Sequence, residues 1–241
     1  MFQRFKDRTD AGRQLGAMLG HVRGENALVL ALPRGGLPVA YEVAHALKAP
    51  LDVLNVRKLG VPWHEELAMG AVATGDTRVL NNEIIMAAGV TKEDLEQATA
   101  VQRLEIDRRE RLYRQGRPAP DMHGRTVVLV DDGIATGATV RAAISVIRAQ
   151  HPARLILAVP VAQGSVAAEL EREVDELVCV RKPSDLYAIG VWYDHFPQLT
   201  DVEVQTTLAR AAAEPEAALL NVPSKAGSRD GEMDENEMPV V

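Results

Sequence analysis

The sequence predicts an α/β protein with a doubly wound parallel sheet, to which a small hood and a mobile loop with a helical insertion are added. Two observations support this prediction. Short apolar runs of strand length alternate with segments of helical periodicity along most of the chain, as in parallel sheets with helices on both faces. In addition, two of the apolar runs end directly in glycine-containing turns that open a helix.

Composition and charge exclude several classes of protein. Of 241 residues, 46% are hydrophobic and 25% are charged, which is typical of globular domains and not of collagen, coiled coils or disordered chains. The longest apolar runs, such as 27–32, are too short to span a membrane. The charged N-terminus lacks the apolar region of a signal peptide. We therefore expect a cytoplasmic protein with no membrane partner.

The charge balance argues against a nucleic-acid partner, and the single cysteine limits disulfide and zinc chemistry. The net charge is −7, from 27 basic and 34 acidic residues, whereas a nucleic-acid surface needs a basic excess. We therefore expect no nucleic-acid partner. Cys179 is the only cysteine, which excludes an internal disulfide and a cysteine-based zinc site.

The first part of the chain contains two helix–strand pairs. Thr9 or Asp10 is expected to cap a helix whose apolar residues recur at helical spacing. The run 27–32 predicts a buried strand, a helix follows from about 38 to 48, and the run 51–56 predicts a second strand.

An insertion at about 60–122 interrupts this alternation. Short strands of a hairpin are predicted at 71–73 and 79–80. Thr91-Lys-Glu-Asp94 resembles a capping box and opens a helix to about Gln115. Basic and acidic residues alternate along this helix, so it should present a solvated face.

The remaining elements complete the predicted sheet. Strands are expected at 126–130, 155–161 and 177–180. One helix follows the strand at 126–130 and its loop and runs to about Gln150, and another is expected at 165–172.

Domain boundaries follow from where this pattern ends. We expect a domain over 1–210 with a hood at about 184–203, and a disordered acidic tail over 211–241. Residues 223–241 hold five acids and two bases with little apolar material, a composition that cannot bury a core.

Two acids mark the carboxyl end of the strand predicted at 126–130. Asp131 and Asp132 follow it directly, and open α/β sheets bind ligands at that edge. Carboxylates there can accept hydrogen bonds from sugar hydroxyls. Mg²⁺ can bridge them to phosphate oxygens while keeping several waters. An ordinary strand-to-helix turn with an Asp cap is the alternative explanation.

A loop of small residues follows the acids and opens the next helix. Gly137 lets the backbone approach a ligand closely, and the amides from Ala135 to Thr139 are expected to point at a phosphate. The hydroxyls of Thr136 and Thr139 can donate to the same oxygens. The segment lacks the Lys of a P-loop and the spacing of G-x-G-x-x-G. The combination favours a phosphorylated sugar.

The whole segment resembles the phosphoribosyl-diphosphate (PRPP) binding motif of the type I phosphoribosyltransferases. The matching residues are Val127-Val-Leu-Val-Asp131-Asp132-Gly-Ile-Ala135-Thr136-Gly137-Ala138-Thr139. Similarity in element order extends over about 1–205. The resemblance implies a cytoplasmic enzyme of nucleotide metabolism, such as salvage. It would use PRPP and Mg²⁺, transfer the phosphoribosyl group to a nitrogen acceptor (a nucleobase or a related compound) and release pyrophosphate.

The resemblance also implies roles for residues of the motif and of two other strand ends. Asp131 and Asp132 would act in catalysis and hold the metal ion, and 135–139 would bind PRPP. Arg34, Gly35 and Gly36 follow the first strand, where family members bind pyrophosphate, often through a strained peptide. Lys58, next to Arg57, ends the second strand, where a basic residue also contacts pyrophosphate in several members. A glycine turn with solvated basic side chains is the alternative.

A mobile loop that closes over the reacting groups is a further family feature. Here it would run from Leu59 to about Gly70, and its closure would exclude water. His64, Glu65 and Glu66 lie in this stretch and are candidates for proton transfer.

The hood contains a concentration of aromatic residues. Four of the nine aromatics lie between 187 and 196, and planar rings with polar edges suit stacking on a heterocycle. The family resemblance makes Trp192 and Tyr193 candidates for binding the base. A small satellite core is the competing explanation. Asp194 and Asp201 either read ring nitrogens or cap turns.

One departure from the family narrows the acceptor. Enzymes for 6-oxopurines usually carry an Asp where this chain has Ala135, which argues against a hypoxanthine- or guanine-type mechanism. Adenine- and orotate-type enzymes have a small residue there. The helix at 91–115 also departs from the compact salvage enzymes, so the acceptor is left open.

Two alternatives to a transferase remain. A PRPP- or nucleotide-sensing regulator on the same fold would need a basic surface, which the acidic balance disfavours. An unrelated phosphosugar-binding α/β hydrolase is disfavoured by the paired glycine loops and by the lack of a G-x-S-x-G elbow. Family members are often dimers, so a homodimer is compatible with the sequence, although nothing in it fixes an interface.

Overall fold

The centre of the molecule is a five-stranded parallel sheet with the order β2-β1-β6-β7-β8. The computed structural model describes residues 3–74 and 77–214. The predicted doubly wound α/β class is confirmed. The strands of this sheet are β1 (Ala27–Ala31), β2 (Leu51–Val53), β6 (Thr126–Val130), β7 (Arg154–Val161) and β8 (Glu176–Arg181).

Successive residues of each central strand face opposite layers of helices. Leu129 of β6 packs in the same core as α5 and α6, whereas Val128 and Val130 pack in the core of α1, α2 and α7. All five residues of β6 are buried, because a parallel sheet is covered on both faces. The helices are α1 (Arg8–Met18), α2 (Gly36–Leu47), α5 (Ala138–Arg148), α6 (Gly164–Leu170) and α7 (Asp201–Ala213), with short 3₁₀ turns η1 (Gly20–Val22) and η2 (Ile189–Trp192).

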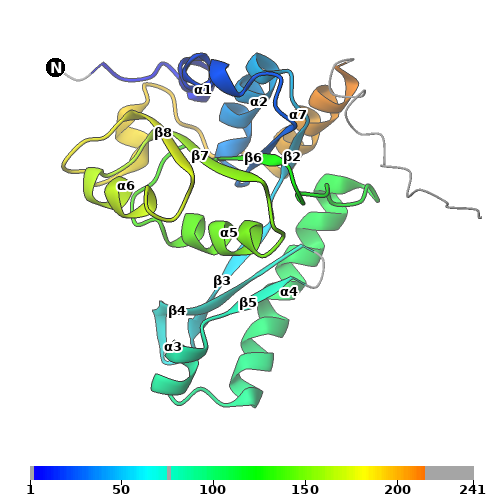
Figure 1. Cartoon of the computed structure of the whole chain (residues 1–241), viewed down its shortest axis with the longest axis vertical. Coiled ribbons are helices and arrows are strands. Elements are labelled where there is room, and N and C mark those ends of the chain that lie inside the picture. The colour runs from blue at the N-terminus through cyan, green and yellow to red at the C-terminus, as the bar shows by residue number, and fades with distance from the viewer. Residues whose placement is uncertain (1–2, 75–76, 215–241) are drawn as a thin grey trace, which may run out of the picture.

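A second body, which we call the arm (residues 56–114), projects from the sheet (Figure 1). Its three strands form a separate antiparallel sheet with the order β3-β4-β5. Its own small core joins Leu59, Met69, Leu95 and Ile106, among others. The elements of the arm are β3 (Val56–Val61), β4 (His64–Ala73), β5 (Arg78–Leu80), α3 (Asn82–Ala87) and α4 (Lys92–Arg114).

A buried polar network fastens the arm to the edge of the parallel sheet. The buried Arg114 at the end of α4 donates to Asp52 at 2.5 Å and to the carbonyl of Val53 at 2.8 Å, and it lies 2.6 Å from Glu110. Glu110 in turn accepts from Asn55 at 2.5 Å. Burial raises the pKa of Asp52, although the charge of Arg114 opposes this. The arm is therefore held in part by charged groups, beside the buried contacts of Val56, Ala71 and Ala73 with the core of α5.

Several predicted elements are confirmed. Ala71 pairs with Val79 in the predicted hairpin, and Thr91 and Asp94 form the predicted capping box of α4. Among residues 3–74 and 77–214, no helix is long and apolar enough to cross a membrane.

Other predicted boundaries were wrong. Asp7 caps α1, in place of Thr9 or Asp10, because its carboxylate accepts from the amide of Asp10. The strand predicted at 51–56 is divided between β2 and β3, because Asn55 points into the polar network of the arm.

The stretch predicted as a mobile loop has regular structure. Residues 59–70 belong to β3, β4 and the turn between them, and movement of this hairpin stays a prediction. The helix α7 was not predicted, and it extends to Ala213, past the boundary set at 210. The rest of the predicted tail, 215–241, lies outside the described residues.

Candidate functional site

Two loops meet at the carboxyl edge of the parallel sheet. Ala31 of β1 pairs with Val130 of β6, so the loops that follow these strands leave the sheet side by side. A Cβ on Gly35 would overlap Oδ2 of Asp132, and one on Gly36 would lie 2.8 Å from the carbonyl oxygen of Val130. Only glycine permits this approach. The Pro33–Arg34 peptide bond beside these glycines is cis.

The two acids of the motif, Asp131 and Asp132, lie at this meeting point. Each has one carboxylate oxygen that accepts no hydrogen bond from the described residues. The amide of Asp132 donates to Oδ1 of Asp131 at 2.8 Å. Oδ2 of Asp132 accepts from Nε of Arg8 at 2.9 Å, and Nη2 of the same guanidinium lies 2.9 Å from that oxygen in an ion pair. In the part of the chain that the structure describes, no group donates to Oδ2 of Asp131 or Oδ1 of Asp132. Two carboxylate oxygens are therefore available to a ligand.

The environment of the two acids favours binding of hydrogen-bond donors or a cation. Burial, followed by the charge of Asp132, raises the pKa of Asp131 well above its usual range. Burial also raises the pKa of Asp132, against the opposing charge of Arg8. A ligand that supplies donors or positive charge would relieve the cost of holding both groups ionised at this edge.

The loop after the acids contains a row of backbone amides without hydrogen-bond partners among the described residues. Gly137 has a φ of 76°, and no side chain caps α5, which begins one residue later. Across the described ranges, no amide from 135 to 139 donates a hydrogen bond within the chain. Thr136 and Thr139 are exposed. Arg141 donates to the carbonyl of Thr136 at 3.1 Å and steadies the loop. Such a helix N-terminus suits an anion.

A cavity of about 850 Å³ opens beside these loops. The first glycine loop, β3, α4 and the start of α5 all line it, and it is lined by four basic residues against two acidic ones. The basic residues are Arg34, Arg57, Lys58 and Arg109. The cavity therefore has a local positive excess in a chain whose net charge is −7.

The structure brings some of the predicted residues together here. Arg34, Lys58 and Thr139 line the same cavity, although they lie far apart in sequence. Arg57 also lines this cavity, and its guanidinium is in an ion pair with Glu105 at 3.4 Å.

The residues suggested for proton transfer differ in position. His64 and Glu65 are both exposed. Glu65 lines the cavity of about 850 Å³, whereas His64 is not among its lining residues. The side chain of Glu66 lies outside the described residues.

The aromatic residues of the hood are mostly packed. Tyr193 is 3% exposed and Trp192 is 8% exposed, and both belong to a small core with Phe5. The ring centroid of Tyr193 lies 5.3 Å from that of Phe5, and its hydroxyl donates to the carbonyl of Asp132 at 2.6 Å. The satellite-core explanation accounts for this position of Tyr193, and base binding stays a prediction.

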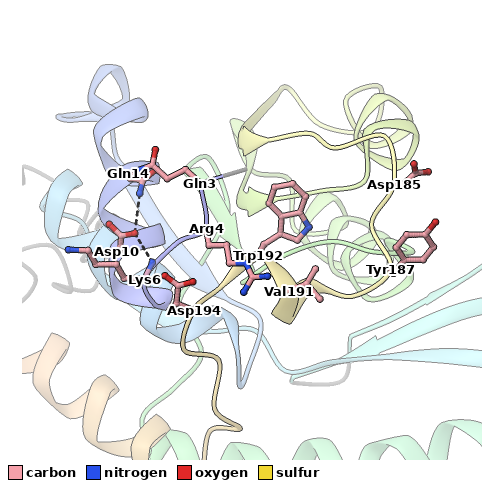
Figure 2. Close-up of a pocket in the computed structure, with 10 residues that line it drawn as sticks. All are labelled: Gln3, Arg4, Lys6, Asp10, Gln14, Asp185, Tyr187, Val191, Trp192 and Asp194. Atoms are coloured by element: carbon pink, nitrogen blue, oxygen red, sulfur yellow. Dashed lines mark hydrogen bonds between the residues drawn. The ribbon is translucent and has the colours of Figure 1, made fainter. Parts of the chain in front are cut away.

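Trp192 also borders a second cavity, of about 870 Å³, between the hood and the N-terminal segment. Figure 2 shows Trp192 beside Arg4 and Val191. The backbone amide of Lys6 and the side-chain amide of Gln14 both donate hydrogen bonds to the carboxylate of Asp10. Its lining residues include none of the residues predicted to bind PRPP.

Asp201 has a role other than the two considered from sequence. It accepts from the hydroxyl of Tyr113 at 2.5 Å and from Arg108 at 3.3 Å, and Thr200 is the residue that caps α7. Asp201 therefore joins α4 to α7. Burial, with the Asp201 hydrogen bond, raises the pKa of Tyr113 to about 12.

Two residues near the acids, Arg8 and Tyr193, were not predicted as their partners. Arg8 lies 124 positions before Asp132, and no local pattern connects positions so distant. The only available signal was a basic residue just before the first predicted helix.

A parallel sheet with paired acids and an uncapped helix N-terminus at one edge defines an α/β protein of the class that places ligands at the carboxyl ends of its strands. Comparison with known families agrees with this class. The family model described as "Phosphoribosyl transferase domain" matches residues 13–194 of this chain. The chain belongs to the phosphoribosyltransferase family.

Individual relatives are similar over most of the chain. Two proteins of Mycobacterium tuberculosis, from strains CDC 1551 and H37Rv, are named "Putative phosphoribosyl transferase MT0597" and "Putative phosphoribosyl transferase Rv0571c". Each is 43% identical over 230 residues, which cover 95% of this chain and 52% of theirs. The chain thus spans about half the length of these relatives. The crystal structure of TT1426 from Thermus thermophilus is 41% identical with a TM-score of 0.80, covering 86% of this chain and 98% of that one.

Proposed function

We propose that the protein transfers the 5-phosphoribosyl group of PRPP to a nitrogen acceptor, with Mg²⁺, and releases pyrophosphate. The observation that carries this proposal is the meeting of the two loops at Gly35 and Asp132. Support comes from the carboxylate oxygens without donors and the unbonded amides beside this meeting point, and from the basic cavity, which Arg34, Lys58 and Thr139 line but Asp131 and Asp132 do not. These are the groups that a sugar diol, a terminal phosphate and a diphosphate require.

Each part of PRPP has a counterpart in this arrangement. The amides of 135–139 and the hydroxyls of Thr136 and Thr139 would bind the 5-phosphate. The free oxygens of Asp131 and Asp132 would accept from the ribose hydroxyls. Arg34 and Lys58, which line the cavity, would bind the diphosphate as charge-assisted donors.

The acids fit a Mg²⁺ ion that arrives with the substrate. Among the described residues, no cluster of three or more His, Cys, Asp or Glu side chains is placed to hold a metal ion. Two adjacent carboxylates with free oxygens suit an ion that takes its other ligands from substrate oxygens and water. When bound, such an ion would neutralise charge on the departing diphosphate.

The chain would promote the reaction by positioning and electrostatics. The bond between C1 of the ribose and the diphosphate oxygen breaks, and a bond forms between C1 and the acceptor nitrogen. Charge then spreads over C1 and the ring oxygen, as in glycoside cleavage. Asp131 and Asp132 would stabilise this positive charge, while the basic cavity receives the negative diphosphate.

The proton lost by the acceptor nitrogen needs a base near the cavity. Glu65 is the best placed of the suggested residues, since it lines the cavity. This chain has Ala135 at the position where enzymes for 6-oxopurines usually carry an Asp, which favours a different acceptor. Trp192 stays the candidate for stacking on it.

A thermal-shift titration tests the proposal. With Mg²⁺ and PRPP at about a hundredfold excess over the dissociation constant, binding should stabilise the fold by about 2.7 kcal/mol. For a chain of this size that corresponds to roughly 5–11 °C in Tm. Ribose 5-phosphate should give a smaller shift and ATP little. A chain that PRPP does not stabilise would contradict the proposal.

Variants separate the acids from a general charge effect. Replacing both Asp131→Asn and Asp132→Asn should abolish the PRPP shift while the protein stays folded. The matched control replaces two exposed acids, Asp107→Asn and Glu171→Gln, and should keep the shift. Pyrophosphate release across a panel of nitrogen acceptors then distinguishes a transferase from a sensor, and light scattering tests for a homodimer.

A further inference from the structure

Arg8 is a buried arginine that makes an unusually complete set of contacts at the edge of the site. Only 8% of the residue is exposed. Its Nε and Nη2 both lie 2.9 Å from Oδ2 of Asp132, and its Nη1 donates to the carbonyl of Pro197 at 2.8 Å. The guanidinium carbon lies 3.8 Å from the centroid of the Phe196 ring. All three nitrogens of the guanidinium therefore have a polar contact, and its face lies on an aromatic ring.

These contacts fix the orientation of one carboxylate. Because both nitrogens meet the same oxygen, Oδ2 of Asp132 is held on the side of Arg8 and Gly35. The hydroxyl of Tyr193 holds the carbonyl of the same residue at 2.6 Å. The remaining oxygen, Oδ1, has no donor among the described residues. Asp132 is thus fixed at both its backbone and its side chain.

Stability alone is a weak explanation for such a pair. Burying two charges costs desolvation energy, and replacing buried ion pairs by apolar residues is often neutral or stabilising. A function for the pair is more economical here because one partner is an acid of the PRPP motif and the other contacts the hood.

We propose that Arg8 is a positioning residue for recognition of the ribose diol. By holding Oδ2 of Asp132, it turns Oδ1 toward the sugar hydroxyls and keeps it there before the ligand arrives. This inference rests on the proposed function, and it adds the N-terminal helix to the site. Arg8 itself contacts the carboxylate, not the sugar.

The choice of arginine follows from the geometry. A guanidinium can direct two N–H groups at one oxygen and a third at a carbonyl in a single plane, and it stacks on an aromatic ring. A lysine ammonium would keep the charge but donate from one nitrogen. Arg8→Lys should therefore leave Asp132 paired but less firmly oriented.

Equilibrium binding to two probes tests the proposal on the full chain with Mg²⁺. One probe is ribose 5-phosphate, and the other is 2,3-dideoxyribose 5-phosphate, which lacks both hydroxyls. The ratio of their affinities reports recognition of the diol alone, because loss of folding or of phosphate binding affects both probes equally. In Arg8→Gln this ratio should fall about tenfold, the effect of misplacing a hydrogen bond to a charged group.

A matched variant controls for the charge of the helix. Arg13 lies on the same helix in an exposed ion pair with Glu42 at 3.1 Å, and Arg13→Gln should keep the wild-type ratio. Arg8→Lys should give a ratio between those of the wild type and Arg8→Gln. If Arg8→Gln fails to fold, Arg8→Lys decides the question.

The possible outcomes separate this inference from the proposed function. If the wild type prefers ribose 5-phosphate and both Arg8 variants keep that preference in full, the role of Arg8 is refuted while PRPP binding stands. If the wild type binds neither probe, or binds both equally, recognition of the ribose diol by Asp131 and Asp132 is refuted. The proposed function is then contradicted on this point, and so is the role of Arg8. A reduced ratio in the Arg8 variants, with Arg13→Gln unchanged, supports it.

Discussion

The parallel sheet and the arm are held together in different ways. The central strands of the sheet are buried on both faces between two apolar cores. The arm has one small core of its own. It is attached by Val56, Ala71 and Ala73, which pack in the core of α5, and by the polar network of Arg114. The difference indicates that the sheet is stable through apolar burial on both faces, whereas the position of the arm depends on one apolar contact with α5 together with the polar network.

The two tryptophans give each region its own probe. Trp63 lies in the turn of the arm hairpin and is 60% exposed, whereas Trp192 lies in the small core beside the parallel sheet. Variants with one tryptophan can therefore follow the two regions separately.

The largest expected effect comes from a cavity in the sheet. Leu129 is fully buried in β6, and Leu129→Ala should lower the free energy of unfolding by about 2–5 kcal/mol. In urea denaturation, the unfolding midpoints reported by Trp63 and Trp192 should shift together, because the arm has no anchor once the sheet unfolds. If the Trp63 signal kept its wild-type midpoint, the arm would be independent of the sheet.

The next effect comes from cutting the anchor of the arm. Arg114→Met leaves the half-buried Asp52 and Glu110 without their partner, which should cost about 3 kcal/mol. We expect hydrogen exchange to accelerate in the arm while the strands of the parallel sheet stay protected. The exposed Arg111→Met, one turn earlier, is the control. Equal acceleration in both regions would contradict the comparison.

A smaller effect is expected where a glycine contacts the acids. In Gly35→Ala the new Cβ would overlap Oδ2 of Asp132, so the acid must move. PRPP affinity should fall at least about tenfold, or about 1.4 kcal/mol, in calorimetric titration. Gly20→Ala is the control, since no atom lies within 4 Å of a Cβ there. Unchanged affinity in Gly35→Ala would show that this approach does not matter for binding.

The smallest effect concerns pH and the surface of the arm. Hydrogen bonds from Arg108 and Arg109 lower the pKa of Glu105 from 4.5 to about 2. A lowered pKa gives stability that is present above about pH 4.5 and is lost as the pH falls toward 2. Glu105→Gln should therefore lower Tm at neutral pH and make little difference near pH 2. Solvent screening keeps the effect within about 1 kcal/mol. A larger difference at acid pH would refute the assignment.

Local sequence patterns predicted the carboxyl edge of the parallel sheet better than the arm. The apolar run at 126–130 and the acids after it follow from neighbouring residues, and the structure has the same strand. The capping box at Thr91 is also local. In contrast, the apolar run at 51–56 gives no sign of its break, because Asn55 is turned by Glu110, which lies 55 positions later.

The remaining features depend on contacts between distant residues. The hairpin at 59–70 contains turn-forming Gly60 and Pro62, and it becomes regular because Leu59 and Met69 pack against α4. The link from Arg8 to Asp132 is longer still. Periodicity reports which face of an element is apolar, but not which polar group will meet it.

The attachment of the arm has a consequence for how the molecule is divided. The chain leaves the parallel sheet at Val53, and Arg114 brings it back to the carbonyl of that same residue. None of the arm's strands belongs to the order β2-β1-β6-β7-β8. The segment between the two points is thus continuous in sequence and lies outside the order of the parallel strands, although its residues Val56, Ala71 and Ala73 pack in the core of α5. Excising it behind a short linker would leave the sheet's connectivity intact, and would remove α4, a wall of the basic cavity.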